Sequence, residues 1–510
     1  MFVRFFFAIL FFALNSPTFS QSGNLDLTFS NDGKVTTSFG SGNDFANATA
    51  LQTDGKIVVA GKSYNGTDYD IAIARYNIDG TLDNTFSQDG KLTMPIGTLD
   101  DAAEALIIRP NGKILIAGAT LNNGLNDFVL VQYNSDGTVD NNFGLGGIVK
   151  IDFGANDGAN CMAIYNDGKI VVAGVSGDFN LKLFAIARIN SDGSMDNTFS
   201  NDGKEMTQIG DYMNFANDLA IANDGKIIVA GGASNNDETD YAVLVRYNID
   251  GTIDYTFGSD GNGRVYCSQG ADDTFTSIAI LNDGKILAAG NSYINDINFD
   301  DILLVRYTNN GLIDDTFGAN GKVLTNYCTN DYCNSLIVQQ DNKIVAAGGS
   351  IGCPAFVLSR YTENGTLDNS FGNSGILTTD FGPDDEMATC VIKQNDTKLV
   401  VSGYRNNATS YDFAIARYEN LLSNILTVDA TENLLDIYPN PAIENITISL
   451  NKQANNVAIE VYDIYGNLVM VEENKSGDHF YLKTSNLASG TYCIKLNIID
   501  SPYRAMFIKK

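Results

Sequence analysis

A short apolar stretch that follows a tight turn recurs seven times, and it constrains the fold more than any other feature of the chain. Its first copy is Asp54–Gly61, with the sequence DGKIVVAG. The lysine marks each copy, and the copies recur at intervals of about 57 residues: Lys56, Lys113, Lys169, Lys226, Lys285, Lys343 and Lys398. A fixed period of this length is typical of repeat architectures. Asp-Gly or Asn-Gly before an apolar run predicts a buried strand that follows a hairpin turn.

Two further motifs recur with the same period. One is the apolar run Ile71–Tyr76, which returns in every repeat up to Phe413–Tyr418. The other is Leu82–Phe86, with the same pattern at Leu25–Phe29 and Leu367–Phe371, and a glycine and a short strand follow it. Because no apolar period of 3.6 residues runs through residues 24–420, the pattern predicts an all-β fold.

The repeats occupy residues 24–420, and their length suits four short strands with their turns. Four-stranded sheets repeated around an axis form a seven-bladed β-propeller; the alternative is an open β-solenoid, whose coils are usually shorter. We assign residues 46–51 to the innermost strand of the first blade and residues 91–94 to its outermost strand. The last blade then has only three strands. We therefore expect residues 34–39 to complete it by pairing antiparallel with residues 412–418, and not with residues 70–76.

The two ends of the chain differ from the repeats. Residues 1–20 read as a signal peptide, with Arg4 before the apolar run Phe5–Leu14 and with small residues that predict cleavage between Ser20 and Gln21. This run is too short to span a bilayer, and there is no other long apolar segment, so no transmembrane helix is expected in the mature chain. Residues 421–433 are expected to form a linker, and residues 434–510 a small β-sandwich of short strands.

The terminal module carries three short motifs in a fixed order: Tyr438–Pro441, Val461–Val469 and Leu487–Lys495. Together with the ending Lys509-Lys510, they resemble the C-terminal sorting domain of type IX secretion cargo in Bacteroidetes. The resemblance implies that residues 434–510 engage the outer-membrane type IX machinery and are removed. The protein is then released or attached to surface lipopolysaccharide. The seven repeats resemble the delta-60 repeats of bacterial secreted proteins, which are assigned a β-propeller fold and bring no function with them.

Charge and cysteine content exclude several classes of function. The formal charge is −29 and no basic patch is visible, so nucleic acid is not expected as a partner. No Cys-x-x-Cys pair occurs among the seven cysteines, which argues against a zinc site. A local disulfide among Cys328, Cys333 and Cys353 is possible in an oxidising compartment, and the sequence leaves the pairing open.

Catalytic constellations are scarce. The only histidine is His479, in the terminal module, so no Ser-His-Asp triad can form in the repeats. The conspicuous acids recur in every repeat, as Asp79 and Asp83 do in the first, and turn formation explains them. We therefore predict that the protein is not an enzyme. The rival hypothesis is a polysaccharide-active enzyme, which a carboxylate pair that breaks the sevenfold pattern in the axial pocket would favour.

One basic position also recurs. It holds an arginine in six repeats and Gln132 in the remaining one: Arg75, Arg188, Arg246, Arg306, Arg360 and Arg417. We expect each arginine to form a buried ion pair with an aspartate such as Asp83, because a guanidinium between sheets needs such a partner. A ring of ligand-binding arginines is the alternative.

A third position suggests a metal site. Aspartates stand twelve residues before most of the marker lysines, with Asn214 in the fourth repeat and Asp385 placed one residue earlier: Asp44, Asp101, Asp157, Asp273 and Asp331. With the strands assigned as above, they lie where the chain enters each innermost strand, near the axis, and we expect them to form an acidic ring that binds Ca²⁺. The alternative is a turn cap at each of these strands.

The sequence as a whole predicts a secreted or surface-exposed binding or adhesion protein, with a glycan or a protein as its ligand. The loops at residues 63–68, 234–239 and 292–298 differ between repeats and are the expected contact region. A passive surface structural component is the third hypothesis.

Overall fold

The computed structural model describes residues 22–122, 124–178, 180–235, 240–294, 300–382, 384–395, 397–420, 436–463, 468–497 and 503–510. The signal peptide and the linker predicted at residues 421–433 lie outside these ranges. The described residues form strands, turns and loops, without a helix that could span a membrane. The chain divides into two compact units, Met1–Leu421 and Leu422–Lys510.

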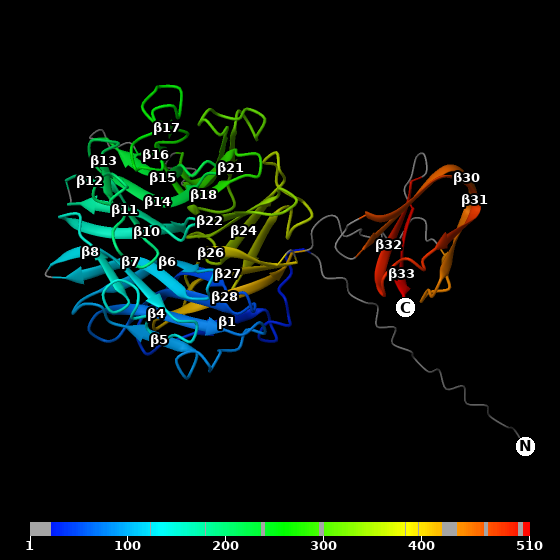
Figure 1. The fold of residues 1–510 in the computed structure, drawn as a ribbon, viewed down its shortest axis with the longest axis horizontal. Coiled ribbons are helices and arrows are strands. Elements are labelled where there is room, and N and C mark those ends of the chain that lie inside the picture. Colours follow the sequence, from blue (N-terminus) through cyan, green and yellow to red (C-terminus); the bar gives the residue numbers. More distant parts are fainter. Residues whose placement is uncertain are drawn as a thin grey trace, which may run out of the picture. The chain divides into compact units, whose positions relative to one another are not determined.

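The first unit is a seven-bladed β-propeller (Figure 1). In blade one, β2 (Asp44–Leu51), β3 (Ile57–Tyr64), β4 (Tyr69–Tyr76) and β5 (Lys91–Met94) pair antiparallel in chain order. Blades two, three and four follow the same order, with β6 (Asp101–Ile108), β7 (Ile114–Asn122), β8 (Leu125–Tyr133) and β9 (Ile148–Ile151) in blade two, β10 (Asn156–Ile164), β11 (Ile170–Gly177), β12 (Lys182–Ile189) and β13 (Lys204–Thr207) in blade three, and β14 (Asn214–Ile221), β15 (Ile227–Ser234), β16 (Asp240–Tyr247) and β17 (Arg264–Cys267) in blade four. Blade five holds β18 (Asp272–Ile280), β19 (Ile286–Tyr293), β20 (Asp300–Tyr307) and β21 (Lys322–Thr325), and blade six holds β22 (Asp331–Val338), β23 (Ile344–Ser350), β24 (Phe356–Tyr361) and β25 (Ile376–Thr379). The last part of the propeller chain supplies β26 (Glu386–Asn395), β27 (Lys398–Asn406) and β28 (Tyr411–Glu419) to blade seven.

The N-terminal strand closes the ring. β1 (Lys34–Thr37) pairs antiparallel with β28, from Lys34 opposite Ala416 to Thr37 opposite Phe413. This pairing confirms the prediction made from the assignment of innermost and outermost strands in the sequence. Blade seven therefore has the order β1-β28-β27-β26, and both chain ends of the propeller share one sheet. This closure pairs two sheet edges that would otherwise be open to other chains.

The second and third strands of each blade are buried on both faces, because each blade packs between two neighbours. The glycine that ends the DGKIVVAG motif has a steric role. A Cβ on Gly61 would lie 1.9 Å from the carbonyl oxygen of Phe45, since a bulge after Ala46 brings β2 close to β3. The same approach recurs in the other blades.

The three sequence motifs meet in one buried charge cluster per blade. In blade one the Asp83 carboxylate lies 2.8 Å from Arg75 Nε and 2.9 Å from Lys56 Nζ. The guanidinium also lies over the Phe86 ring, 4.8 Å from its centroid. The predicted arginine–aspartate ion pair is thus confirmed, and the marker lysine joins it.

Two blades depart from this arrangement in an informative way. In blade two Gln132 replaces the arginine, and its side-chain amide donates to Asp140 at 2.6 Å. Arg109 donates to the Gln132 side-chain oxygen at 2.5 Å, so this blade also has a guanidinium in the cluster. In blade seven the acid is Asp26, from the N-terminal segment, which pairs with Arg417 at 2.7 Å. The Asp26–Arg417 ion pair therefore joins the N-terminal segment to the last blade, as the pairing of β1 with β28 does.

The second unit is one curved, nearly closed sheet of β29 (Asp436–Tyr438), β30 (Asn445–Asp463), β31 (Leu468–Lys483), β32 (Gly490–Asn497) and β33 (Tyr503–Lys509). β30 pairs with β31 along its length, with β29 through its first half and with β32 through its second half. A single core that includes Ile448, Val461 and Ile494 fills the module predicted at residues 434–510.

Candidate functional site

The propeller has two chemically different faces. Because neighbouring strands are antiparallel, the loops before each innermost strand and the loops between second and third strands lie on one face, which we call the loop face. The turns before the marker lysines and the Leu-Asp-x-Thr-Phe loops lie on the other, the motif face. The variable loops 63–68, 234–239 and 292–298 belong to the loop face, although residues 236–239 and 295–299 fall outside the described ranges.

The predicted acidic register is buried at the start of the innermost strands. Asp44, Asp101 and Asp157 are each at most 1% exposed. Each accepts a hydrogen bond from a backbone amide of the preceding loop, for example from Phe39 N to Asp44 Oδ2 at 2.8 Å. Asp273, Asp331 and Asn214 are bonded in the same way. This geometry is that of the turn cap named as the alternative; calcium binding by the whole register stays a prediction.

Blade seven requires a correction. Glu386, and not Asp385, holds the register position: Glu386 is 2% exposed and accepts a hydrogen bond from Phe381 N at 2.6 Å, whereas Asp385 is exposed. Glu386 stands twelve residues before Lys398, the same spacing as the other members of the register. The prediction of Asp385 was wrong because it favoured an aspartate over the residue at the correct spacing. Burial raises the pKa of Glu386 to about 7, although the Phe381 amide opposes the shift.

Hydrogen bonds link the innermost strands of neighbouring blades into a belt around the axis. The bulge residue of each strand donates to a carbonyl of the next blade, as Asn47 does to Ala103 O at 3.0 Å and Thr389 to Ala46 O at 2.8 Å. Asn160, Asn217, Thr276 and Asn334 make the equivalent bonds. The seventh position holds Glu104. Sequence reasoning missed this belt, although its members stand nine residues before the marker lysines.

Two acids break the sevenfold pattern on the innermost strands. Burial raises the pKa of Glu104 to about 7, against the opposing charge of Lys62. Asp218, two blades further along, accepts hydrogen bonds from Ser277 Oγ at 3.1 Å and Ile278 N at 2.9 Å. Burial nevertheless raises the pKa of Asp218 to about 6. Both groups can therefore exchange a proton near neutral pH.

An aromatic cluster lies on the loop face where blades seven and one meet. Phe45 is its centre, with ring centroids 5.0 Å from both Tyr404 and Tyr411 and 6.3 Å from Tyr69. Tyr64 adds a fifth ring at 5.3 Å from Tyr69. The Lys62 ammonium lies 5.0 Å from the Tyr69 ring and 5.6 Å from the Phe45 ring. All of these side chains are partly exposed. We call these five rings and Lys62 the aromatic cluster.

A disulfide braces the loop face at blade six. Cys328, before β22, is bonded to Cys353, between β23 and β24, which settles the pairing left open by the sequence. Cys333 is buried and free. The two cysteines are 25 positions apart in the sequence.

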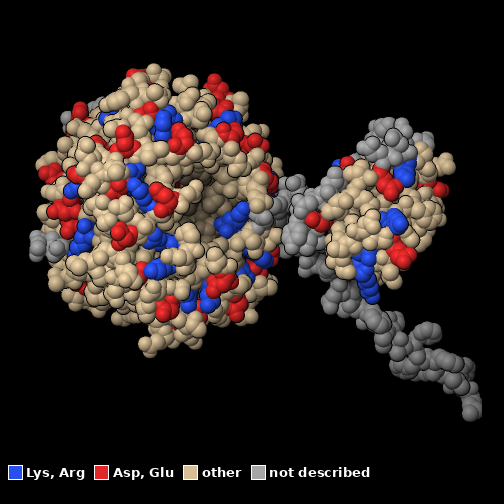
Figure 2. All heavy atoms as spheres, in the orientation of Figure 1, with Lys and Arg blue, Asp and Glu red and all other residues tan. Residues whose placement is uncertain are grey.

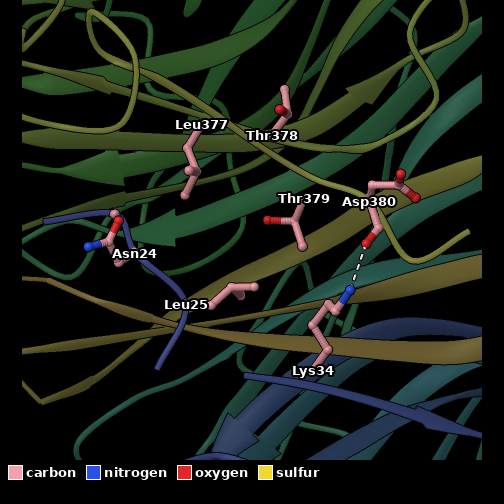
Figure 3. A pocket seen from close by; sticks show the side chains of 8 residues that line it. Asn24, Leu25, Lys34, Leu377, Thr378, Thr379 and Asp380 are labelled. Carbon is pink, nitrogen blue, oxygen red and sulfur yellow. Dashed lines mark hydrogen bonds between the residues drawn. The ribbon is translucent and has the colours of Figure 1, made fainter. Parts of the chain in front are cut away.

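Cavities also lie away from the aromatic cluster. One of about 280 Å³ lies where the closing N-terminal segment meets β25, lined by Leu25, Leu377 and Thr379, and Lys34 Nζ donates to the Asp380 carbonyl at 2.9 Å beside it (Figure 3). Figure 2 shows a hollow in the middle of the propeller, with basic and acidic side chains around its rim. The repeat-breaking acids lie on the strands nearest the axis.

Comparison with known families identifies both units. The model "Domain of unknown function (DUF5122) beta-propeller" matches seven segments: residues 52–86, 109–143, 166–199, 222–257, 281–317, 339–371 and 394–420. The model "Secretion system C-terminal sorting domain" matches residues 436–510. A comparison with curated proteins gave no match.

Several solved structures resemble the chain in outline only. A protein of unknown function from Dyadobacter fermentans is 13% identical with a TM-score of 0.42, covering 76% of this chain and 98% of its own. A PL25 ulvan lyase is 12% identical with a TM-score of 0.44, covering 76% and 96%. The β-propeller domain of the Trilobed protease from Pyrococcus furiosus is 10% identical with a TM-score of 0.37, covering 76% and 99%. No function follows from similarity at this level.

Proposed function

We propose that this protein, which carries seven DUF5122 β-propeller repeats and a type IX C-terminal sorting domain, is a secreted binding protein that recognises an extracellular glycan through the aromatic cluster. The observation that carries the proposal is the gathering of five rings at one blade junction. The position of Phe45 is also aromatic in blades four and six, as Phe215 and Tyr332, but those two rings are not part of a cluster of this size among the described residues. A scaffold that only needs packing does not require five rings at one blade junction.

The chemistry of the cluster suits a sugar ligand. Aromatic rings offer flat apolar faces for the C–H surface of a pyranose, and the tyrosine hydroxyls offer polar edges for its hydroxyl groups. Lys62 adds a positive charge on a protein whose formal charge is −29. A glycan with carboxylate or sulfate groups therefore fits this junction better than the rest of the surface.

Export explains where such binding takes place. The sorting domain implies that the type IX secretion machinery is a partner and that the protein is secreted or held at the outer-membrane surface. The Cys328–Cys353 disulfide is compatible with that oxidising environment. Glycans of the surroundings are therefore accessible ligands.

A glycan array probed with the mature chain tests the proposal. We expect binding to one or more acidic polysaccharides, weakened about 5-fold or more by Tyr404→Ala or Tyr411→Ala. Tyr255→Ala, at a 65% exposed tyrosine of the motif face, is the matched control and should bind like the wild type. Binding that survives both cluster substitutions would place the contact elsewhere, and no binding to any glycan would favour a protein ligand or a passive structural role.

A polysaccharide-active enzyme is the second candidate. It is supported by Glu104 and Asp218, the two acids that break the repeat and have pKa values of about 7 and 6. If this hypothesis is correct, the mature chain cleaves a polysaccharide, and Glu104→Gln abolishes cleavage while it leaves glycan affinity intact. Absence of cleavage across a panel of acidic polysaccharides would reject the enzyme.

A further inference from the structure

Three side-chain positions meet at each blade junction on the loop face. The first lies at the start of the third strand, the second directly after the outermost strand, and the third at the start of the next innermost strand. Between blades five and six these positions hold Asp301, Asn326 and Asp331, and Asn326 Nδ2 donates to Asp301 Oδ1 at 2.7 Å. An amide donor thus compensates a carboxylate at that junction.

The junction of blades two and three differs in its second residue. It holds Asp127, Asp152 and Asp157, so a third carboxylate stands where the other junction has the amide. One carboxylate oxygen from each residue lies within 4.8 Å of the other two. Among the seven junctions this is the one at which all three positions are acidic; the others hold Asp70, Pro95, Asp101; Leu183, Gln208, Asn214; Tyr241, Ser268, Asp273; Asp301, Asn326, Asp331; Ala355, Asp380, Glu386; and Asp412, Ser38, Asp44.

The hydrogen bonds around the cluster leave ligand oxygens free. Asp157 is 1% exposed; its Oδ2 accepts from Phe153 N at 2.6 Å, and its buried Oδ1 accepts no hydrogen bond, as is also true of Asp44 and Asp101 at junctions without three acids. Asp152 Oδ1 accepts from Gly154 N at 2.6 Å. A buried carboxylate oxygen without a donor, beside two further carboxylates, costs free energy unless a cation joins them.

Nearby basic groups compensate little of this charge. Lys150 acts on Asp127 through its charge. The ammonium of Lys204 donates to the Asp152 carbonyl oxygen at 2.9 Å and lies over the Phe153 ring. The cluster therefore keeps a local excess of negative charge.

We propose that Asp127, Asp152 and Asp157 form a binding site for a hard divalent cation such as Ca²⁺ that joins blades two and three. Three oxygens placed evenly about 2.4 Å from one ion, the usual Ca²⁺–oxygen distance, are about 4.2 Å apart. Carboxylate oxygens that already lie within 4.8 Å of one another therefore need at most a small side-chain adjustment to share an ion. Water completes the coordination on the exposed side of Asp152. The site is independent of the proposed glycan contact, because the aromatic cluster lies at the junction of blades seven and one.

Calorimetric titration of the EDTA-treated mature chain with CaCl₂ tests the proposal. We expect one ion per chain with a Kd of about 10⁻⁴ to 10⁻³ M, the range of extracellular calcium modules. The melting temperature should rise by about 3 °C in 10 mM CaCl₂. No binding heat and no shift in melting temperature at this concentration would overturn the proposal.

Substitutions at the second junction position make the test specific. Asp152→Asn reproduces the amide of the blade five–six junction, so it should abolish calcium binding while the EDTA-treated protein stays as stable as the wild type. Asn326→Asp should create a second site and raise the stoichiometry to about two ions. Asp380→Asn, at a junction with two acids, is the matched control and should change nothing. Binding that persists in Asp152→Asn and is lost in Asp273→Asn would assign the ion to the axial register instead.

Discussion

Glu104 is the one belt position that cannot donate a hydrogen bond when it is ionised. Its counterparts Asn47 and Asn160 donate to the carbonyls of Ala103 and Ala216, which stand two residues after the register positions Asp101 and Asn214. By the same register the acceptor for Glu104 is the carbonyl of Ala159, two residues after Asp157. A protonated carboxyl group can make this bond and a carboxylate cannot. We therefore expect Glu104→Gln to stabilise the propeller at alkaline pH and to leave its stability in acid nearly unchanged.

The magnitude follows from the pKa of Glu104, which burial raises from 4.5 to about 7. The folded state then holds its proton more tightly than the unfolded state. The resulting loss of stability is absent below pH 4.5, grows as the pH rises towards 7 and is constant above. Each pKa unit corresponds to about 1.4 kcal/mol; allowing for partial access to water, we expect a loss of about 2 kcal/mol at pH 8.

Urea unfolding of the mature wild type and of Glu104→Gln at pH 4.5 and pH 8 measures this difference. The substitution should raise the free energy of unfolding by about 2 kcal/mol at pH 8 and by much less at pH 4.5. Asn160→Asp, at the same position in blade three, is the mirror variant and should destabilise the protein mainly at pH 8. An effect of Glu104→Gln that is equal at both pH values, or a loss of stability at pH 8, would refute the reasoning.

Three further predictions concern the charge clusters and the disulfide. Arg246→Ala removes the guanidinium that lies over the Phe257 ring and leaves Lys226 as the remaining ion-pair partner of the buried Asp254 carboxylate, so it should cost about 2 kcal/mol of unfolding free energy in a urea titration, and an unchanged midpoint would contradict this. Burial opposes ionisation of Asp26, but hydrogen bonds from Thr28 and Lys398 and the charge of Arg417 outweigh it and lower its pKa to about 2. This contribution is complete above pH 3.8 and is lost as the pH falls towards 2, so thermal melts should show an acid transition that Asp26→Asn weakens. Reduction of the Cys328–Cys353 bridge should lower stability by about 3 kcal/mol, and a melting temperature insensitive to reductant would argue against it.

Features encoded in local periodicity were predictable. The period of the marker lysines gave seven blades, and the apolar runs located their strands to within a few residues. The assignment of four strands to each repeat left one strand over at the N-terminus and three in the last repeat. It therefore predicted that β1 pairs with β28. The arginine–aspartate pairs were predictable as well, since a repeated buried charge requires a repeated partner.

Contacts between blades were decided by the tertiary structure. The sequence could not show that Asp127, Asp152 and Asp157 meet, or which of Cys328, Cys333 and Cys353 form the disulfide. The spacing to Lys398 did point to Glu386, and only the preference for an aspartate at this position led to Asp385. The sequence also could not show that Phe45, in the first repeat, packs against Tyr404, in the last repeat. Strand and turn preferences act over a few neighbouring residues and are readable along the chain. Which side chains converge depends on bulges, side-chain reach and ring closure, and these are fixed only when all seven blades are in place.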